Sequence, residues 1–82
     1  MERMTLDDVA DGTTVRIVRV AGTGSFRRRL LELGLLPGTP VKRLREAPLG
    51  DPIELSLRGC GLSIRHHEAR DILVEAVQEG SR

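Results

Sequence analysis

The sequence predicts a mainly β domain, built as a small barrel of about five short strands. The chain has 82 residues, which is enough for one domain. Runs of alternating or β-branched apolar residues recur at close spacing, and glycine or proline separates them. Only one segment has a clear helical period. Short, closely spaced strands favour a barrel, because closure removes the free edges of the sheet.

The first strand is predicted over residues 13–20, after a lead-in turn. Val15 and Ile17 keep a period of two, whereas Val18 and Val20 break the pattern expected for one buried face. We interpret this break as a bulge, or as a strand that is buried on both faces for part of its length.

A two-turn helix is predicted over residues 26–33. Phe26, Leu30 and Leu33 share one helical face at spacings of four and three. Ser25 is suited to cap the amino end of this helix. Gly34 stands where a left-handed residue commonly ends a helix.

The clearest strand is residues 53–57, in which apolar and polar side chains alternate strictly. A single helical turn, with Ala69 packed inward, is expected before the last strand. We expect a domain over residues 4–77 with flexible termini at 1–3 and 78–82. The remaining predicted segments are strands at 39–46, 62–65 and 72–77 and a turn at 59–61.

Composition excludes several functional classes. Phe26 is the only aromatic residue, so the chain cannot build the aromatic platforms that bind polyproline or single-stranded nucleic acid. The net charge of +1 is not that of a nucleic-acid-binding protein. Cys60 is the only cysteine, which fits a reducing compartment. With no apolar run of about 18 residues, no insertion into a membrane is expected, and we predict a cytosolic protein.

The stretch "APLGDP" (residues 47–52) predicts a stiffened loop between two strands. Pro48 suits position i+1 of a type I turn that ends at Gly50, and Gly50 equally suits position i+2 of a type II turn. Both alternatives place Leu49 near the tip, before Asp51 and Pro52. Leu49 either folds back onto the barrel or is an apolar anchor for a partner.

Three consecutive arginines, Arg27, Arg28 and Arg29, begin the predicted helix. At 100° per residue they fan over about 200°, so they do not form one tight patch. One interpretation is a solvated face whose aliphatic stems cover the helix. The other is a contact with an acidic or phosphate-bearing partner, since guanidinium groups pair with such groups in a bidentate manner.

His66, His67 and Cys60 are weak candidates for a metal site. Adjacent side chains point about 100° apart on a helix and to opposite faces of a strand, so the two histidines do not converge on one ion. Cys60 would have to fold across a glycine turn to join them. A site shared between two chains is the alternative. No nucleophile or phosphate-loop motif is present, so no enzymatic activity is expected.

Three segments together resemble the FeoA family: "RRRLLELGLLPGTPV" (27–41), "APLGDPIELSLRG" (47–59) and "LSIRHHEARDILV" (62–74). The resemblance implies an SH3-like β-barrel with an inserted helix. It also implies a cytosolic accessory of FeoB, a ferrous-iron transporter with a cytosolic GTPase domain. A similar domain occurs in metal-responsive DNA-binding repressors.

The leading functional hypothesis is therefore a non-enzymatic cytoplasmic protein, recruited to the cytoplasmic face of the inner membrane. It would bind the GTPase part of a FeoB-type transporter through Pro48–Pro52 together with Arg27 and Arg28, and modulate iron uptake. The alternative is a metal-responsive regulatory domain that binds iron or zinc and acts as a homo-oligomer. A nucleic-acid-binding barrel is disfavoured by charge and composition.

Overall fold

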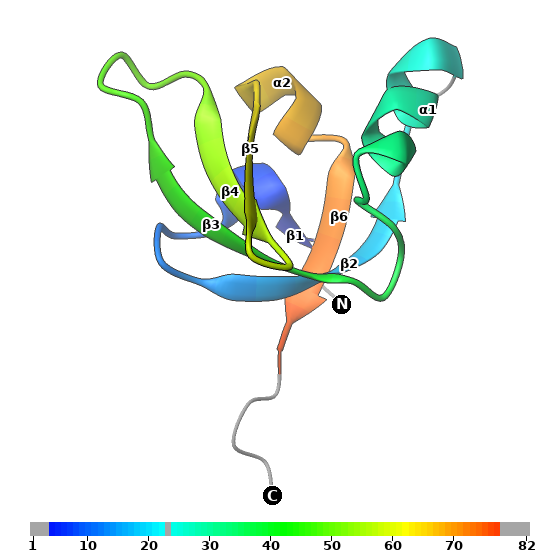
Figure 1. Cartoon of the computed structure of the whole chain (residues 1–82), viewed down its shortest axis with the longest axis horizontal. Helices are drawn as coiled ribbons and strands as arrows, with labels where there is room; N and C mark the ends of the chain where they lie inside the picture. The colour runs from blue at the N-terminus through cyan, green and yellow to red at the C-terminus, as the bar shows by residue number, and fades with distance from the viewer. Residues whose placement is uncertain (1–3, 23, 78–82) are drawn as a thin grey trace, which may run out of the picture.

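The computed structural model describes residues 4–22 and 24–77, so the predicted flexible termini lie outside the described residues (Figure 1). The elements in chain order are β1 (Met4–Thr5), the 3-10 turn η1 (Leu6–Asp8), β2 (Thr14–Val20), α1 (Gly24–Glu32), β3 (Pro40–Glu46), β4 (Ile53–Leu57), β5 (Cys60–Ile64), α2 (His66–Ala69) and β6 (Ile72–Ala76).

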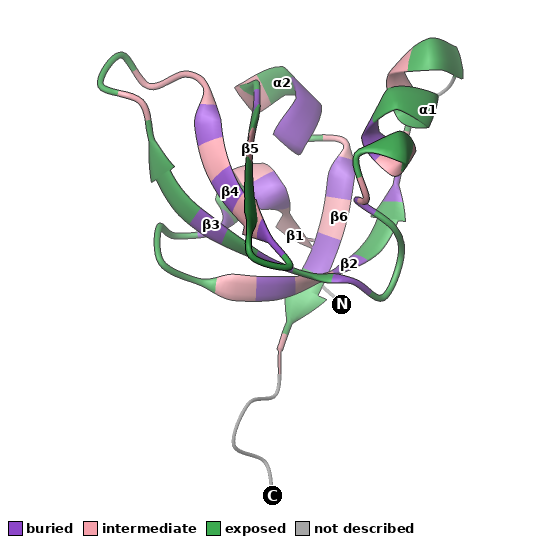
Figure 2. Ribbon diagram, in the orientation of Figure 1, coloured by how far each residue is buried: buried purple, intermediate pink, exposed green. Residues whose placement is uncertain are grey.

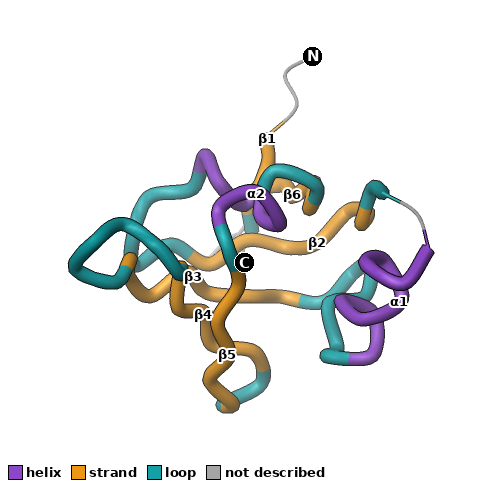
Figure 3. Tube along the Cα trace, turned by 90° about the horizontal axis from the view of Figure 1, so that it is seen from above, coloured by secondary structure: helices purple, strands orange, loops and turns teal. Residues whose placement is uncertain are grey.

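The strands form one curled antiparallel sheet in the order β1-β6-β2-β3-β4-β5. In Figure 1, α2 lies over the open top of this sheet and α1 lies to one side. The view from above shows α1 outside the strands, beyond the ends of β2 and β3 (Figure 3). The predicted mainly β, barrel-like fold is confirmed. Within the described residues, however, β1 and β5 end the strand order without pairing, so closure is incomplete.

The predicted bulge is present in β2. The pairing of β2 with β6 shifts between Ile17 and Arg19 and leaves Val18 exposed. A second irregularity, between Arg43 and Arg45, interrupts the pairing of β3 with β4. Such bulges bend a strand and increase its twist, which helps a small sheet to curl around one core.

The core is aliphatic and lies inside the curl of the sheet (Figure 2). Leu30 from α1 and Ala69 from α2 belong to this core. The inward position of Ala69 was predicted. Buried positions alternate along β4, as its sequence pattern indicates. The fully buried side chains that build the centre are those of Leu6, Ile17, Leu30, Leu35, Ile53, Leu55, Ile64 and Ile72.

The end of α1 follows the predicted glycine cap. Gly34 has a φ of +105°, its N–H donates to the Leu31 carbonyl at 3.0 Å, and the Leu35 N–H donates to the Leu30 carbonyl at 3.1 Å. This pair of bonds is the Schellman arrangement, in which a left-handed residue ends the helix. It turns Leu35 into the core and leaves Leu33 exposed, so the prediction that Leu33 shares the buried helix face is wrong.

Three other boundaries differ from prediction. Because α1 begins at Gly24, Ser25 lies inside the helix and not at its cap. The turn before β5 consists of Arg58 and Gly59, both with positive φ, and Cys60 already belongs to the strand. Two positive φ values are what a tight hairpin turn requires. The two-residue strand β1 was not predicted; it forms only by pairing with β6, near the other end of the chain.

Candidate functional site: the projecting loop and the adjacent groove

The loop between β3 and β4 projects from the barrel with Leu49 at its tip. The Gly50 N–H donates to the Ala47 carbonyl at 2.7 Å, which makes Ala47 and Gly50 the first and fourth residues of a turn. This is the type I alternative, with Pro48 at i+1. Leu49 is 96% exposed, so the interpretation in which it folds back onto the barrel is wrong.

The base of the loop is fixed to the barrel. The Ala47 N–H donates to the Pro52 carbonyl at 2.9 Å. The Asp51 carboxylate accepts from the backbone N–H of His66 at 3.0 Å and from the Arg65 guanidinium at 3.2 Å. The tip is therefore held away from the core by contacts at its base, and two prolines limit its freedom.

His66 connects the base of this loop to the beginning of the chain. Its Nδ1 contacts the carboxylate of Asp7, and its Nε2 lies 3.5 Å from the carboxylate of Glu46. The hydrogen bond to Asp7 raises the pKa of His66 above its usual 6.5, more than partial burial lowers it. The Gly50 carbonyl and the negative charge of Glu46 also raise the pKa of His66.

The pKa of Asp7 moves in the opposite direction. Burial favours the neutral carboxyl group, but the contacts with His66 and Arg70 outweigh burial and lower the pKa of Asp7 below its usual 3.8. Both shifts favour the charged forms, so Asp7 and His66 form an ion pair at pH values between their two pKa values.

Arg43 supports this cluster from inside the barrel. It is only 4% exposed and donates to the Asp11 carboxylate at 3.0 Å and to the Glu46 carboxylate at 2.6 Å. It also donates to the carbonyls of Leu6 and Asp7, each at 3.2 Å. A buried guanidinium with four acceptors fixes η1 against β3, and thereby places Asp7 beside His66.

The candidate metal residues do not converge. His66 is engaged by carboxylates on both ring nitrogens, while His67 is exposed. Cys60 is exposed at the opposite end of β5, and an extended strand separates positions by about 3.3 Å per residue. In the part of the chain that the structure describes, no group of three histidine, cysteine or acidic side chains is arranged to hold a metal ion.

The arginine run on α1 fans out as predicted. Arg27 donates to the Val20 carbonyl at 3.2 Å, Arg28 is exposed, and Arg29 reaches Glu68 on α2. Figures 1 and 3 place the Pro48–Pro52 loop and α1 on opposite sides of α2. The predicted partner-binding residues are therefore two separate surfaces and not one patch.

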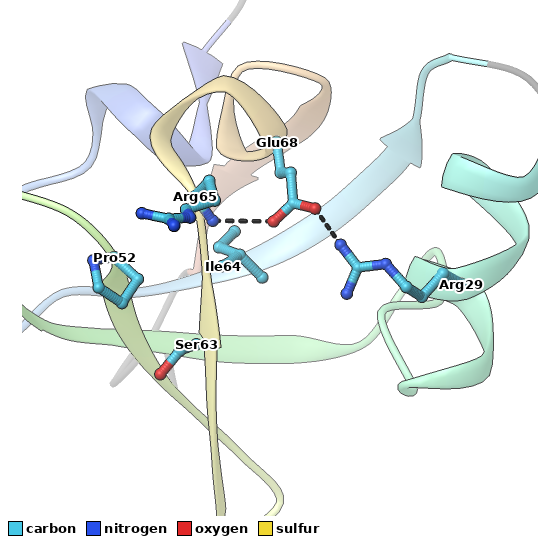
Figure 4. A pocket seen from close by; sticks show the side chains of 6 residues that line it. All are labelled: Arg29, Pro52, Ser63, Ile64, Arg65 and Glu68. Carbon is cyan, nitrogen blue, oxygen red and sulfur yellow. Dashed lines mark hydrogen bonds and ion pairs between the residues drawn. The ribbon is translucent and has the colours of Figure 1, made fainter.

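A groove of about 460 Å³ lies between these two surfaces, and the sequence did not reveal it. Figure 4 shows Arg29 entering it from α1 toward Glu68, whose other carboxylate oxygen accepts from the Arg65 N–H at 2.8 Å. That bond is half of a capping box, a motif usually recognised by serine or threonine at its first position. Because Arg65 occupies the N-cap position, the sequence does not show the serine or threonine by which a capping box is recognised. The lining residues are Arg29, Pro52, Ser63, Ile64, Arg65 and Glu68.

These features define a small barrel-like domain with a stiffened apolar loop and a polar groove. No helix in the described ranges, 4–22 and 24–77, is long and apolar enough to cross a membrane. The FeoA domain family matches residues 4–76, and the chain belongs to this family. The family resemblance noted in the sequence is thereby confirmed.

Three known proteins illustrate the relationship. A Porphyromonas gingivalis Fe(2+) transport protein A/Fe(2+) transporter FeoB fusion protein is 35% identical over 78 residues, which are 95% of this chain and 9% of the fusion protein. This chain thus spans about a tenth of that relative. The solution structure of the FeoA protein from Chlorobium tepidum is 41% identical, with a TM-score of 0.84 over 95% of this chain and 76% of that one.

The third is the crystal structure of Stenotrophomonas maltophilia FeoA complexed with zinc, described as a prokaryotic SH3 domain protein. It is 26% identical, with a TM-score of 0.76 over 88% of this chain and 89% of that chain. The SH3-like fold that the resemblance implied is confirmed. The family is involved in ferrous iron transport, and in the fusion relative the domain is joined to FeoB.

Proposed function

We propose that this protein is a non-enzymatic cytoplasmic accessory of ferrous iron uptake, which docks on the GTPase-bearing cytosolic part of a FeoB-type transporter and modulates transport. Docking recruits it to the cytoplasmic face of the inner membrane. The observation that carries the proposal is the 96% exposure of Leu49 on a loop that is fixed at its base.

The loop has the physical properties of a docking element. An aliphatic side chain that moves from water into a partner pocket contributes on the order of 1.5–3 kcal/mol. Because Pro48 and Pro52 stiffen the loop and Asp51 ties it to α2, little conformational entropy is lost when a partner binds. Exposed Arg28 on α1 adds a cation on a second surface, which can steer an acidic partner toward this protein.

The fusion relative supports the choice of partner. Joining two modules in one chain raises their effective concentration and favours modules that work in contact. In a separate chain the same association needs an interface of its own, and the exposed loop is suited to provide one.

The test is binding of the whole protein to the cytosolic part of a FeoB-type transporter, measured by titration calorimetry. Leu49→Asp is expected to weaken binding about tenfold or more while leaving the melting temperature close to that of the parent. Val18→Asp, at the exposed bulge of β2, is the matched control and is expected to bind like the parent. Unchanged affinity of Leu49→Asp would refute docking through the loop.

A further inference from the structure

The sheet has a free edge at β5. In the described part of the chain β5 pairs with β4 and with no other strand, and it ends the strand order. Free edges present unpaired backbone groups to which another extended chain can add. The edge is therefore a place where a partner can bind through its backbone.

The register identifies which groups face outward. Leu57 and Cys60 flank the two-residue turn and so form the bonded pair that closes it. Along an antiparallel strand, residues alternate between facing the neighbour and facing away. Cys60, Leu62 and Ile64 consequently bond to β4, whereas Gly61 and Ser63 direct their N–H and C=O groups away from it.

Arg65 is the residue that follows the end of β5. The Arg65 N–H donates to Glu68, which lines the groove shown in Figure 4. The same groove is lined by Ser63 and Ile64, consecutive residues whose side chains point to opposite faces of the sheet. The groove therefore lies at the end of β5 that meets α2.

A second hollow of about 180 Å³ adjoins β5 on its paired side. It is lined by Leu44, Glu54, Leu55, Gly61, Leu62 and Ser63, so it extends from β5 over β4 to β3. The free edge is therefore flanked by Gly61 and Ser63, and by Arg29 and Arg65 at the end that meets α2.

The charge exposed at the groove is positive. The side chains of Arg29 and Arg65 are 52% and 59% exposed, whereas that of Glu68 is 9% exposed. Each guanidinium has one carboxylate contact, with Glu68 and Asp51 respectively. A guanidinium carries five N–H donors, so both retain donors for an incoming carboxylate.

We propose that the free edge of β5 is a docking strand for an extended acidic segment of a partner protein. The segment adds to the sheet beside Gly61 and Ser63, places an acidic side chain toward Arg29 and Arg65, and places an aliphatic side chain toward Leu62. This surface borders the base of the Pro48–Pro52 loop at Pro52 but does not include Leu49, so the inference does not depend on docking through Leu49.

The test uses a capped synthetic peptide of alternating valine and glutamate, titrated into the whole protein and followed by amide hydrogen exchange in NMR spectra. Exchange of the Gly61 and Ser63 amides is expected to slow about tenfold at saturation. Arg65→Ala is expected to weaken peptide binding about fivefold. Lys42→Ala, which removes one exposed cation elsewhere on the sheet, is expected to leave it unchanged.

Two further comparisons separate backbone addition from nonspecific attraction. A peptide that is N-methylated at every valine and every glutamate cannot donate backbone hydrogen bonds and is expected not to bind. Ser63→Pro removes an outward N–H without removing a bond to β4, and is expected to weaken binding, whereas Ser63→Ala retains the N–H and binds like the parent. If Ser63→Pro fails to fold, the N-methylated peptide alone tests whether binding requires backbone hydrogen bonds to β5.

The proposal is overturned if the Gly61 and Ser63 amides exchange as before, or if the N-methylated peptide binds as well as the parent peptide. It is overturned equally if a valine–lysine peptide binds as tightly as the glutamate peptide. Protection of these amides by self-association of the protein alone would assign the edge to a second copy of the chain and also refute the proposal.

Discussion

His66 Nδ1 contacts the Asp7 carboxylate, and this contact joins residues 59 positions apart in the chain. It ties α2 to η1 at the point where the base of the projecting loop meets the barrel. The same imidazole faces Glu46 on β3 and receives a further contact from the Gly50 carbonyl. One titratable side chain thus connects three segments that carry or support the loop.

This contact predicts that stability depends on pH. The folded-state pKa of His66 is raised, so its contribution is complete below the usual 6.5 and is lost as pH rises through the folded value. The pKa of Asp7 is lowered, so its contribution is present above 3.8 and is lost as pH falls through the folded value. The Asp7–His66 pair therefore stabilises the fold most between pH 3.8 and pH 6.5, which are the ordinary pKa values of the two groups.

Denaturant unfolding at about pH 5.5 and about pH 8 measures the effect, and the parent is expected to be more stable at the lower pH. His66→Gln is expected to remove most of that difference. His67→Gln, which changes the exposed neighbour, is expected to keep it. A parent with equal stability at both values would contradict the assignment.

The buried guanidinium of Arg43 predicts a second measurable asymmetry. Arg43→Met leaves the buried carbonyl of Leu6 and the partly exposed carboxylates of Asp11 and Glu46 without their donor, and is expected to destabilise the fold by about 1–3 kcal/mol. Arg45→Met removes an exposed pair with Glu54 from the same strand and is expected to lower stability by less than about 1 kcal/mol. Urea unfolding of both variants compares them directly, and equal losses would refute a structural role for Arg43.

Local patterns predicted most of the fold. The alternation of Ile53, Leu55 and Leu57 marked β4 correctly, since each of these residues is buried. The break at Val18 marked the bulge, and Gly34 marked the end of α1. These features are determined within a few residues, where steric preferences and a single buried face decide the backbone.

What could not be predicted depends on residues far apart in the chain. β1 exists only because Met4 and Thr5 pair with Val74 and Leu73. The groove depends on Arg29 and Glu68, which are 39 positions apart and come from different helices. Neither relationship leaves a periodic signal, because the contact is set by how the sheet curls.

The exposed cation Arg28 predicts an effect on association rate more than on stability. Arg28→Glu is expected to slow association with the cytosolic part of a FeoB-type transporter about threefold to tenfold at low salt, with little change at high salt. Stopped-flow mixing at low and at high ionic strength measures the association rate constant. Lys42→Glu on β3 carries the same charge change away from α1 and serves as the control. A change confined to dissociation would count against steering by α1.

The glycine that ends α1 predicts a stability loss with two separable causes. A Cβ at Gly34 would lie 2.9 Å from Cδ2 of Leu57, and the backbone there has a φ of +105°. Gly34→Ala therefore combines the left-handed penalty of about 1–2 kcal/mol with crowding that costs about 1–3 kcal/mol.

Gly12 provides the matched comparison, because its φ is +87° and a Cβ there would meet nothing within 4 Å. Gly12→Ala is expected to show the left-handed penalty alone, so Gly34→Ala should be the less stable of the two in thermal and urea unfolding. The double variant Gly34→Ala with Leu57→Ala removes the crowding atom and tests its share through a double-mutant cycle. If the cycle shows no coupling between positions 34 and 57, the extra loss at Gly34 does not come from contact with β4.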